Sequence, residues 1–150
     1  MFIAPHLTFT TQAREAIEFY HRVFGGQLQI GTFAEWKAQD PTVEIDDAAL
    51  DLLVYGTLKM DNGCVIEASD AGEPNQNVPG GEKPALGAID VATTNDKLDE
   101  LRAAFSALAE GGTVTAPLEE FGAGEHYGAL VDRFGVTWNF AGTPAGKYLL

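Results

Sequence analysis

Hydrophobic and polar positions in the first half of the chain follow patterns that predict strands around one helix. Residues from Pro5 to Thr11 are β-branched, aromatic or small, which favours a strand. Apolar side chains then recur every three or four residues from Ala13 to Phe24, the spacing of an amphipathic helix. Gly25 and Gly26 end this helix, because glycine adopts the left-handed cap conformation without steric cost. Apolar and polar residues alternate over Gln27–Phe33, which predicts a second strand.

The stretch that follows predicts a loop and then a hairpin. Residues 35–50 are acidic and are broken by Pro41, so we expect a loop with at most one helical turn. Leu52–Ala68 reads as a β-hairpin, with its turn at Asp61-Asn62-Gly63, where asparagine and glycine tolerate positive φ.

The second half of the chain repeats this order. Leu86–Thr94 predicts a strand, and a helical stripe follows, ending at Gly111-Gly112. The stripe consists of Leu98, Leu101, Phe105 and Leu108. We then expect a strand over Thr113–Leu118, a loop over Glu119–Glu125 and a hairpin over Tyr127–Asn139.

The two hairpins are copies of one another. Tyr55–Glu67 aligns with Tyr127–Asn139 without a gap, and the identical pairs are Tyr55 and Tyr127, Gly56 and Gly128, Leu58 and Leu130, and Gly63 and Gly135. Such a repeat indicates two β-α-β-β-β modules. We place them at residues 1–69 and 86–150, joined by a loop over residues 70–85 that is rich in proline and glycine.

The repeat predicts an α+β fold in which the two modules form a curved eight-stranded mixed sheet. The helices cover its outer face, and the concave face encloses a space for a ligand. Because neighbouring strand residues point to opposite faces, Ile66 and Trp138 should pack beneath the helices, with Cys64 on the same side as Ile66. Glu67 and Asn139 should then face the concave side.

Charge and cysteine content indicate which partners and which cellular location to expect. With 22 acidic and 9 basic side chains the net charge is -13, which disfavours nucleic acid and anionic membranes. No apolar run approaches the roughly 20 residues of a membrane span, and the opening residues lack the charged and then apolar pattern of a leader, so we expect neither feature. The single cysteine, Cys64, cannot form an internal disulfide, so we expect a reducing, cytoplasmic location.

Two runs resemble a known family. The Glu-Phe-Tyr-x4-Gly-Gly run at Glu18–Gly26 and the Tyr-Gly-x3-Asp-x-Phe-Gly-Val-x-Trp run at Tyr127–Trp138 resemble the vicinal oxygen chelate superfamily. Within it, the chain is most similar to the PhnB-like branch of the glyoxalase/bleomycin resistance/dioxygenase group. The resemblance implies the paired-module fold and a homodimer. It also implies four metal ligands, one from the first and one from the last strand of each module.

The implied ligand set is incomplete in this chain. Glu67 matches the last-strand ligand of the first module, but Asn139 stands at the corresponding position of the second. Alignment on the helix puts Pro5 at the first-strand position, so His6 would turn inward only with a bulge. We therefore expect no cofactor, with a divalent ion (Zn, Ni, Mn or Fe) held by Glu67 and His6 as the alternative.

The candidate site residues follow from the repeat and from this resemblance. Glu67 and His126 are the catalytic candidates, and Glu67, Asn139, His6, Tyr127 and Tyr55 are the ligand-binding candidates. Simpler interpretations are a structural role for His6, a surface-loop position for His126, and packing roles for the tyrosines and for Trp36.

The expected function is that of a PhnB-like protein with a small-molecule cavity and no assigned reaction. One alternative is a metal-dependent lyase, isomerase or dioxygenase. The other is a protein that sequesters drugs, as bleomycin-resistance proteins do. The sequence favours neither catalysis nor binding alone.

Overall fold

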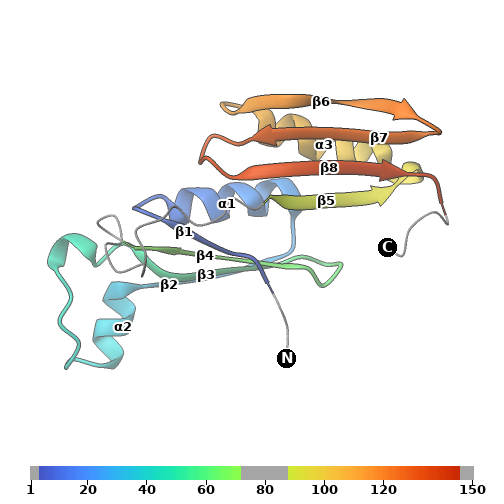
Figure 1. Cartoon of the computed structure of the whole chain (residues 1–150). Coiled ribbons are helices and arrows are strands. Elements are labelled where there is room, and N and C mark those ends of the chain that lie inside the picture. Colours follow the sequence, from blue (N-terminus) through green and yellow to red (C-terminus); the bar gives the residue numbers. More distant parts are fainter. Residues whose placement is uncertain (1–3, 72–87, 146–150) are drawn as a thin grey trace, which may run out of the picture. The chain divides into compact units, whose positions relative to one another are not determined.

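The chain folds into two compact units, Met1–Glu82 and Lys83–Leu150. The computed structural model describes residues 4–71 and 88–145 (Figure 1). Each unit contains a four-stranded mixed sheet with a helix against one face. The predicted α+β class and the two β-α-β-β-β modules are therefore confirmed. Most of the loop predicted at residues 70–85 lies outside the described residues.

The first unit has the sheet order β1-β4-β3-β2. Strands β1 and β4 are parallel, and the other neighbours are antiparallel. Its elements are β1 (His6–Phe9), α1 (Ala13–Phe24), β2 (Gln27–Thr32), α2 (Phe33–Gln39), the short 3-10 helix η1 (Asp47–Ala49), β3 (Leu53–Lys59) and β4 (Val65–Asp70).

The second unit has the equivalent order, β5-β8-β7-β6, again with its first and last strands parallel. Its elements are β5 (Ile89–Thr94), the short 3-10 helix η2 (Asn95–Lys97), α3 (Leu98–Ala109), β6 (Thr113–Gly122), β7 (Glu125–Val131) and β8 (Thr137–Thr143).

The repeated hairpins have the same structure in both units. Leu58 in β3 and Leu130 in β7 are both fully buried. Gly63 and Gly135 occupy equivalent turn positions with φ of 88° and 84°, a conformation that other residues adopt only with strain. The sequence identity of the repeat thus marks the buried positions and the turns.

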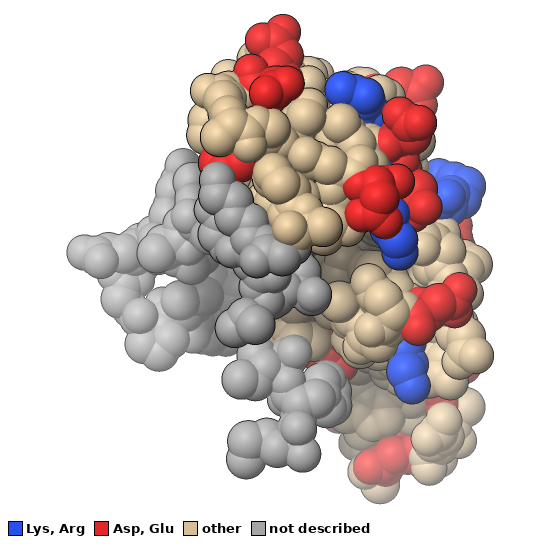
Figure 2. Space-filling model, turned by 90° about the vertical axis from the view of Figure 1, so that its right-hand side faces the viewer, with Lys and Arg blue, Asp and Glu red and all other residues tan. Residues whose placement is uncertain are grey.

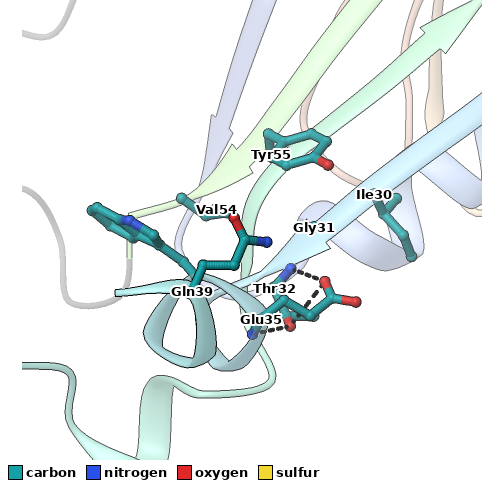
Figure 3. Close-up of a pocket in the computed structure, with 8 residues that line it drawn as sticks. Ile30, Gly31, Thr32, Glu35, Gln39, Val54 and Tyr55 are labelled. Atoms are coloured by element: carbon teal, nitrogen blue, oxygen red, sulfur yellow. Dashed lines mark hydrogen bonds between the residues drawn. The ribbon is translucent and has the colours of Figure 1, made fainter. Parts of the chain in front are cut away.

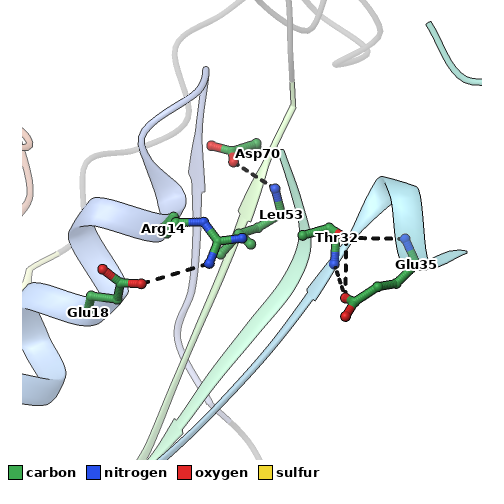
Figure 4. Close-up of polar contacts among 6 residues, drawn as sticks. All are labelled: Arg14, Glu18, Thr32, Glu35, Leu53 and Asp70. Atoms are coloured by element: carbon green, nitrogen blue, oxygen red, sulfur yellow. Dashed lines mark hydrogen bonds and ion pairs between the residues drawn. The ribbon is translucent and has the colours of Figure 1, made fainter. Parts of the chain in front are cut away.

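The segment between β2 and β3 contains a helix that the sequence did not predict. Helix α2 begins with a capping box: the Glu35 amide donates to the Thr32 hydroxyl, and the Thr32 amide donates to the Glu35 carboxylate (Figure 4). At its other end, hydrogen bonds from the side chain and then the backbone of Thr42 hold the pKa of Asp40 below its ordinary value. The loop expected over residues 35–50 is therefore corrected to two short helices and their connections.

The loop predicted at Glu119–Glu125 is also wrong. Strand β6 continues to Gly122 and β7 begins at Glu125, so only Ala123 and Gly124 lie between the two strands. Both take positive φ, which allows the tight reversal. The glycines here mark a turn and not a long loop.

The cores lie between each sheet and its helix, as strand parity predicts. Ile66 is almost fully buried and Trp138 fully buried, on the sides covered by α1 and α3. Phe105 of α3 packs edge-on against Phe140 of β8, with ring centroids 5.1 Å apart. Such pairs add about 0.5–1.5 kcal/mol beyond the burial of their area.

Two buried carboxylates, those of Asp70 and Asp132, accept hydrogen bonds from neighbouring backbone and side-chain donors. Asp70 at the end of β4 accepts hydrogen bonds from the Ala13 amide (2.8 Å), at the start of α1, and from the Leu53 amide (2.9 Å), as Figure 4 shows in part. Asp132 accepts from the amides of Phe134 and Val136 and from Nε1 of Trp138. Each carboxylate thus satisfies backbone donors that burial would otherwise leave unpaired.

Cys64 is exposed, so its predicted place on the buried face is wrong. It precedes the first residue of β4 and belongs to the turn, where its amide donates to the Asn62 side chain. Strand alternation therefore does not extend to it.

Acidic side chains outnumber basic ones, 22 to 9, along the sequence. Figure 2 shows one face, on which acidic side chains are spread out with basic ones among them. In the described part of the chain, no helix combines the length and apolar character needed to cross a membrane.

Candidate functional site

The open face of the first sheet, which is the face away from α1, brings His6 and Glu67 together. The parallel register of β1 and β4 sets His6 directly beside Glu67. His6 Nδ1 lies 3.7 Å from Glu67 Oε2, and the two side chains are 46% and 33% exposed. His6, and not Pro5, is therefore the first-strand residue that shares a face with Glu67, and no bulge in β1 is needed.

Ser69 completes this polar group. Nε2 of His6 lies 2.9 Å from Oγ of Ser69, so the imidazole joins a carboxylate on one side to a hydroxyl on the other. Sequence reasoning did not single out Ser69. The signal was nonetheless present, because Ser69 follows Glu67 by two residues and a strand period of two puts both on one face.

The second unit has a counterpart of this arrangement, with an amide at the position of Glu67 and a carboxylate at the position of His6. Asn139 Nδ2 donates to Asp90 Oδ1 at 2.9 Å, and the Tyr127 hydroxyl donates to Asn139 Oδ1 at 3.2 Å. Asp90 pairs with Asn139 in the parallel register of β5 and β8, as His6 pairs with Glu67. Sequence reasoning did not single out Asp90 either.

A metal ion held by protein side chains usually needs three or more nitrogen, oxygen or sulfur ligands. Within the described ranges, no three His, Cys, Asp or Glu side chains are grouped to hold one. The first unit offers His6 and Glu67, and in the second unit Asp90 is hydrogen-bonded to an amide, which is a poor ligand. The donor set in either unit alone does not fit the metal centre that the family resemblance implies.

His126 lies on the face of the second sheet that α3 covers, opposite to the face that carries Tyr127 and Asn139. It pairs with Gly142 in the register of β7 and β8, on the α3 side together with Trp138 and Phe140. Its Nδ1 is buried, and the described residues offer it no hydrogen-bond partner. His126 is therefore separated by the sheet from Tyr127 and Asn139.

Tyr55, in contrast, stands on the open face of the first sheet at the edge of a pocket of about 410 Å3. The pocket lies between α2 and the strands β2 and β3 (Figure 3). Tyr55 and Trp36, two of its lining residues, are 49% and 43% exposed. The packing roles expected for these two aromatic residues are therefore incomplete, because about half of each side chain remains accessible.

The family model of the Glyoxalase/Bleomycin resistance protein/Dioxygenase superfamily matches residues 3–140. A search of curated proteins found no match. Among solved structures, protein PA1353 from Pseudomonas aeruginosa is 30% identical, with 96% of this chain and 98% of that chain covered and a TM-score of 0.69.

Two more distant structures share the fold. One is a PhnB protein from Bacillus cereus, described as a putative 3-demethylubiquinone-9 3-methyltransferase, which is 23% identical over 95% of this chain and 100% of its own, with a TM-score of 0.66. The other is a glyoxylase/bleomycin resistance protein/dioxygenase domain from Frankia sp. EAN1pec, which is 13% identical over 97% and 93% of the two chains, with a TM-score of 0.63. The fold, the paired modules and the family match agree, and the chain belongs to the glyoxalase/bleomycin resistance protein/dioxygenase superfamily.

Proposed function

We propose that this chain binds a small molecule on the open face of its first sheet, through Glu67 and His6, without a metal ion. The observation that carries the proposal is the pairing of a partly buried carboxylate with a half-exposed imidazole at the first- and last-strand positions. These are the positions that carry ligands in metal-binding members of the superfamily.

The geometry suits a ligand that carries hydrogen-bond donors. A contact between two side chains that are both accessible to water contributes at most about 0–1 kcal/mol, so an incoming group displaces it at little cost. The Glu67 carboxylate can then accept from an amine, hydroxyl or amide. His6 Nε2 and Ser69 Oγ, which lie 2.9 Å apart, can orient a second polar group of the same ligand.

The metal-dependent lyase, isomerase or dioxygenase alternative requires further ligands beside Glu67 and His6. In that chemistry the ion would polarise substrate oxygens. The alternative of drug sequestration requires only a cavity, and it shares the metal-free binding mode proposed here.

Nuclear magnetic resonance of chelator-treated protein tests the proposal. Titration with fragments that bear amines, hydroxyls or amides is expected to shift the amide signals of His6, Glu67 and Ser69. Glu67→Gln should abolish these shifts because it removes the charge, whereas Glu100→Gln, at an exposed position of α3, should preserve them. Fragment binding that appears only after a divalent ion is added would contradict the proposal.

We also propose a homodimer, the common state of superfamily members. Strand β6 is an edge of its sheet and exposes Val114 and Phe121, apolar surface that a second copy can cover. Light scattering at micromolar concentration should report about twice the 16.0 kDa chain mass. A mass near that of one chain throughout this range would rule the dimer out.

A cytoplasmic location without nucleic-acid or membrane partners completes the proposal. The net charge of -13 supports the absence of polyanionic partners. The free, exposed thiol of Cys64 suits a reducing compartment.

A further inference from the structure

We infer that the pocket beside α2 binds an organic cation, meaning a positively charged nitrogen carried on a compact apolar group. The pocket has a volume of about 410 Å3, which is within the range for small-molecule sites. The described residues that line it all belong to the first unit, and neither Glu67 nor His6 is among them. The inference therefore goes beyond the function proposed above and stands independently of it.

Two aromatic side chains supply the first part of the recognition. Trp36 and Tyr55 line the pocket and remain about half exposed. The position of Tyr55 depends on Gly31 in the adjacent strand, because a Cβ on residue 31 would clash with the tyrosine ring. Aromatic rings attract cations through their negative faces, and tryptophan does so most strongly. The glycine at position 31 therefore lets the Tyr55 ring lie against the β2 backbone, where part of the ring remains accessible.

A carboxylate supplies the second part. Glu35 lines the pocket, and both hydrogen bonds that its side chain accepts in the capping box go to Oε2. Its Oε1 takes no part in these two hydrogen bonds and can accept one from a ligand. Because the box fixes the side chain at the start of α2, little rotamer freedom is lost when a ligand binds. The Gln39 amide, which extends from α2 toward Tyr55 in Figure 3, adds a polar group that can accept from an N–H donor.

The lining also disfavours anions. None of the described side chains that line the pocket is basic. Lys37, although it lies on α2, is directed to other partners: its Nζ donates to the Ile45 carbonyl and lies 3.8 Å from Asp47. Ile30 and Val54 complete the wall with aliphatic surface, which suits the apolar part of the ligand.

Choline and 3,3-dimethylbutan-1-ol make a matched pair of probes, because they have nearly the same shape and differ in charge. Each is titrated into the full-length protein at constant ionic strength, and the indole N–H signals are followed by nuclear magnetic resonance. The signal of Trp36 should shift with choline, while that of the buried Trp138 stays in place. We expect choline to bind about tenfold more tightly than the neutral alcohol.

Substitutions inside and outside the pocket localise the effect. Glu35→Gln removes the charge but retains a residue that can close the capping box, and it should weaken choline binding about fivefold to tenfold. Trp36→Leu should weaken it to a similar extent, measured through the amide signals of β2 and β3. Glu100→Gln makes the same charge change at an exposed position of α3 and should leave the affinity as it is.

The inference is overturned if both probes bind equally at α2, if neither binds there, or if choline shifts signals elsewhere while those of α2 stay in place. Loss of choline binding in Glu67→Gln, with Glu35→Gln unaffected, would also overturn it and would assign the cation to the His6–Glu67 site. Because Glu67 is outside the pocket, failure here leaves the function proposed for the open face standing.

Discussion

Replacing Trp138 with alanine is expected to lower the free energy of unfolding by about 3–5 kcal/mol, the usual cost of truncating a buried aromatic residue. Trp138 is fully buried in β8, beneath α3. Its removal leaves a cavity between sheet and helix, and it also leaves the buried Asp132 without the Nε1 donor 2.9 Å away. Reversible urea unfolding, followed by circular dichroism, measures the change.

Two further substitutions separate the contributions. Trp138→Phe retains most of the apolar contact but removes the hydrogen bond to Asp132, so it should cost less than the alanine variant. Trp36→Ala truncates the same kind of side chain where it is 43% exposed, and it should cost far less. A loss below about 1 kcal/mol for Trp138→Ala would show that strand parity in the second unit has been assigned incorrectly.

Replacing Asp70 with alanine should cost about 2–4 kcal/mol, because two buried amides lose a charged acceptor together. One amide opens α1 at Ala13 and the other begins β3 at Leu53. The carboxylate therefore connects the helix, β3 and β4 of the first unit. Denaturant unfolding of the variant, with native-state hydrogen exchange of these two amides, tests both the size and the place of the effect.

Asp51→Ala is the matched control, because it removes an exposed carboxylate from the same unit. It should change stability by less than about 0.5 kcal/mol. Asp70→Asn, which keeps the shape but has one acceptor oxygen, should fall between the two. If Asp70→Ala behaves like the control, the two hydrogen bonds do not stabilise the unit.

The architecture could be predicted because the main sequence features of the module occur twice along the chain. The glycines at positions 63 and 135 mark the same turn, and strand alternation places Ile66 and Trp138 on the helix-covered faces. Periodicity also locates both long helices. These signals are local, so they do not depend on how strands pair.

The segment between β2 and β3 was not predictable in the same way. Helix α2 has only seven residues, none of them buried, and so it lacks the apolar stripe that identifies longer helices. Its remaining signal is the spacing of Thr32 and Glu35, which fits a capping box. The pocket depends on this helix, and it therefore could not be anticipated from hydrophobic patterns.

The candidate site was predicted in part. Parity along β4 placed Glu67 on the open face, but the partner of Glu67 depends on the register between β1 and β4, which joins residues far apart in the sequence. Alignment on the helix favoured Pro5, one residue from His6, and a one-residue shift reverses the face of every side chain in a strand. The same limit explains why Asp90, beside Asn139, was missed.

The central claim is that Glu67 recognises a ligand directly and does not complete a metal centre. Calorimetric titration of chelator-treated protein with zinc, nickel and manganese tests it most directly, on the wild type and on Glu67→Gln. The account predicts no tight stoichiometric binding by the wild type, because Glu67 and His6 are the two donors that the open face of the first unit brings together. Tight binding of one ion per chain that Glu67→Gln abolishes would contradict the account and favour the metal-dependent alternative.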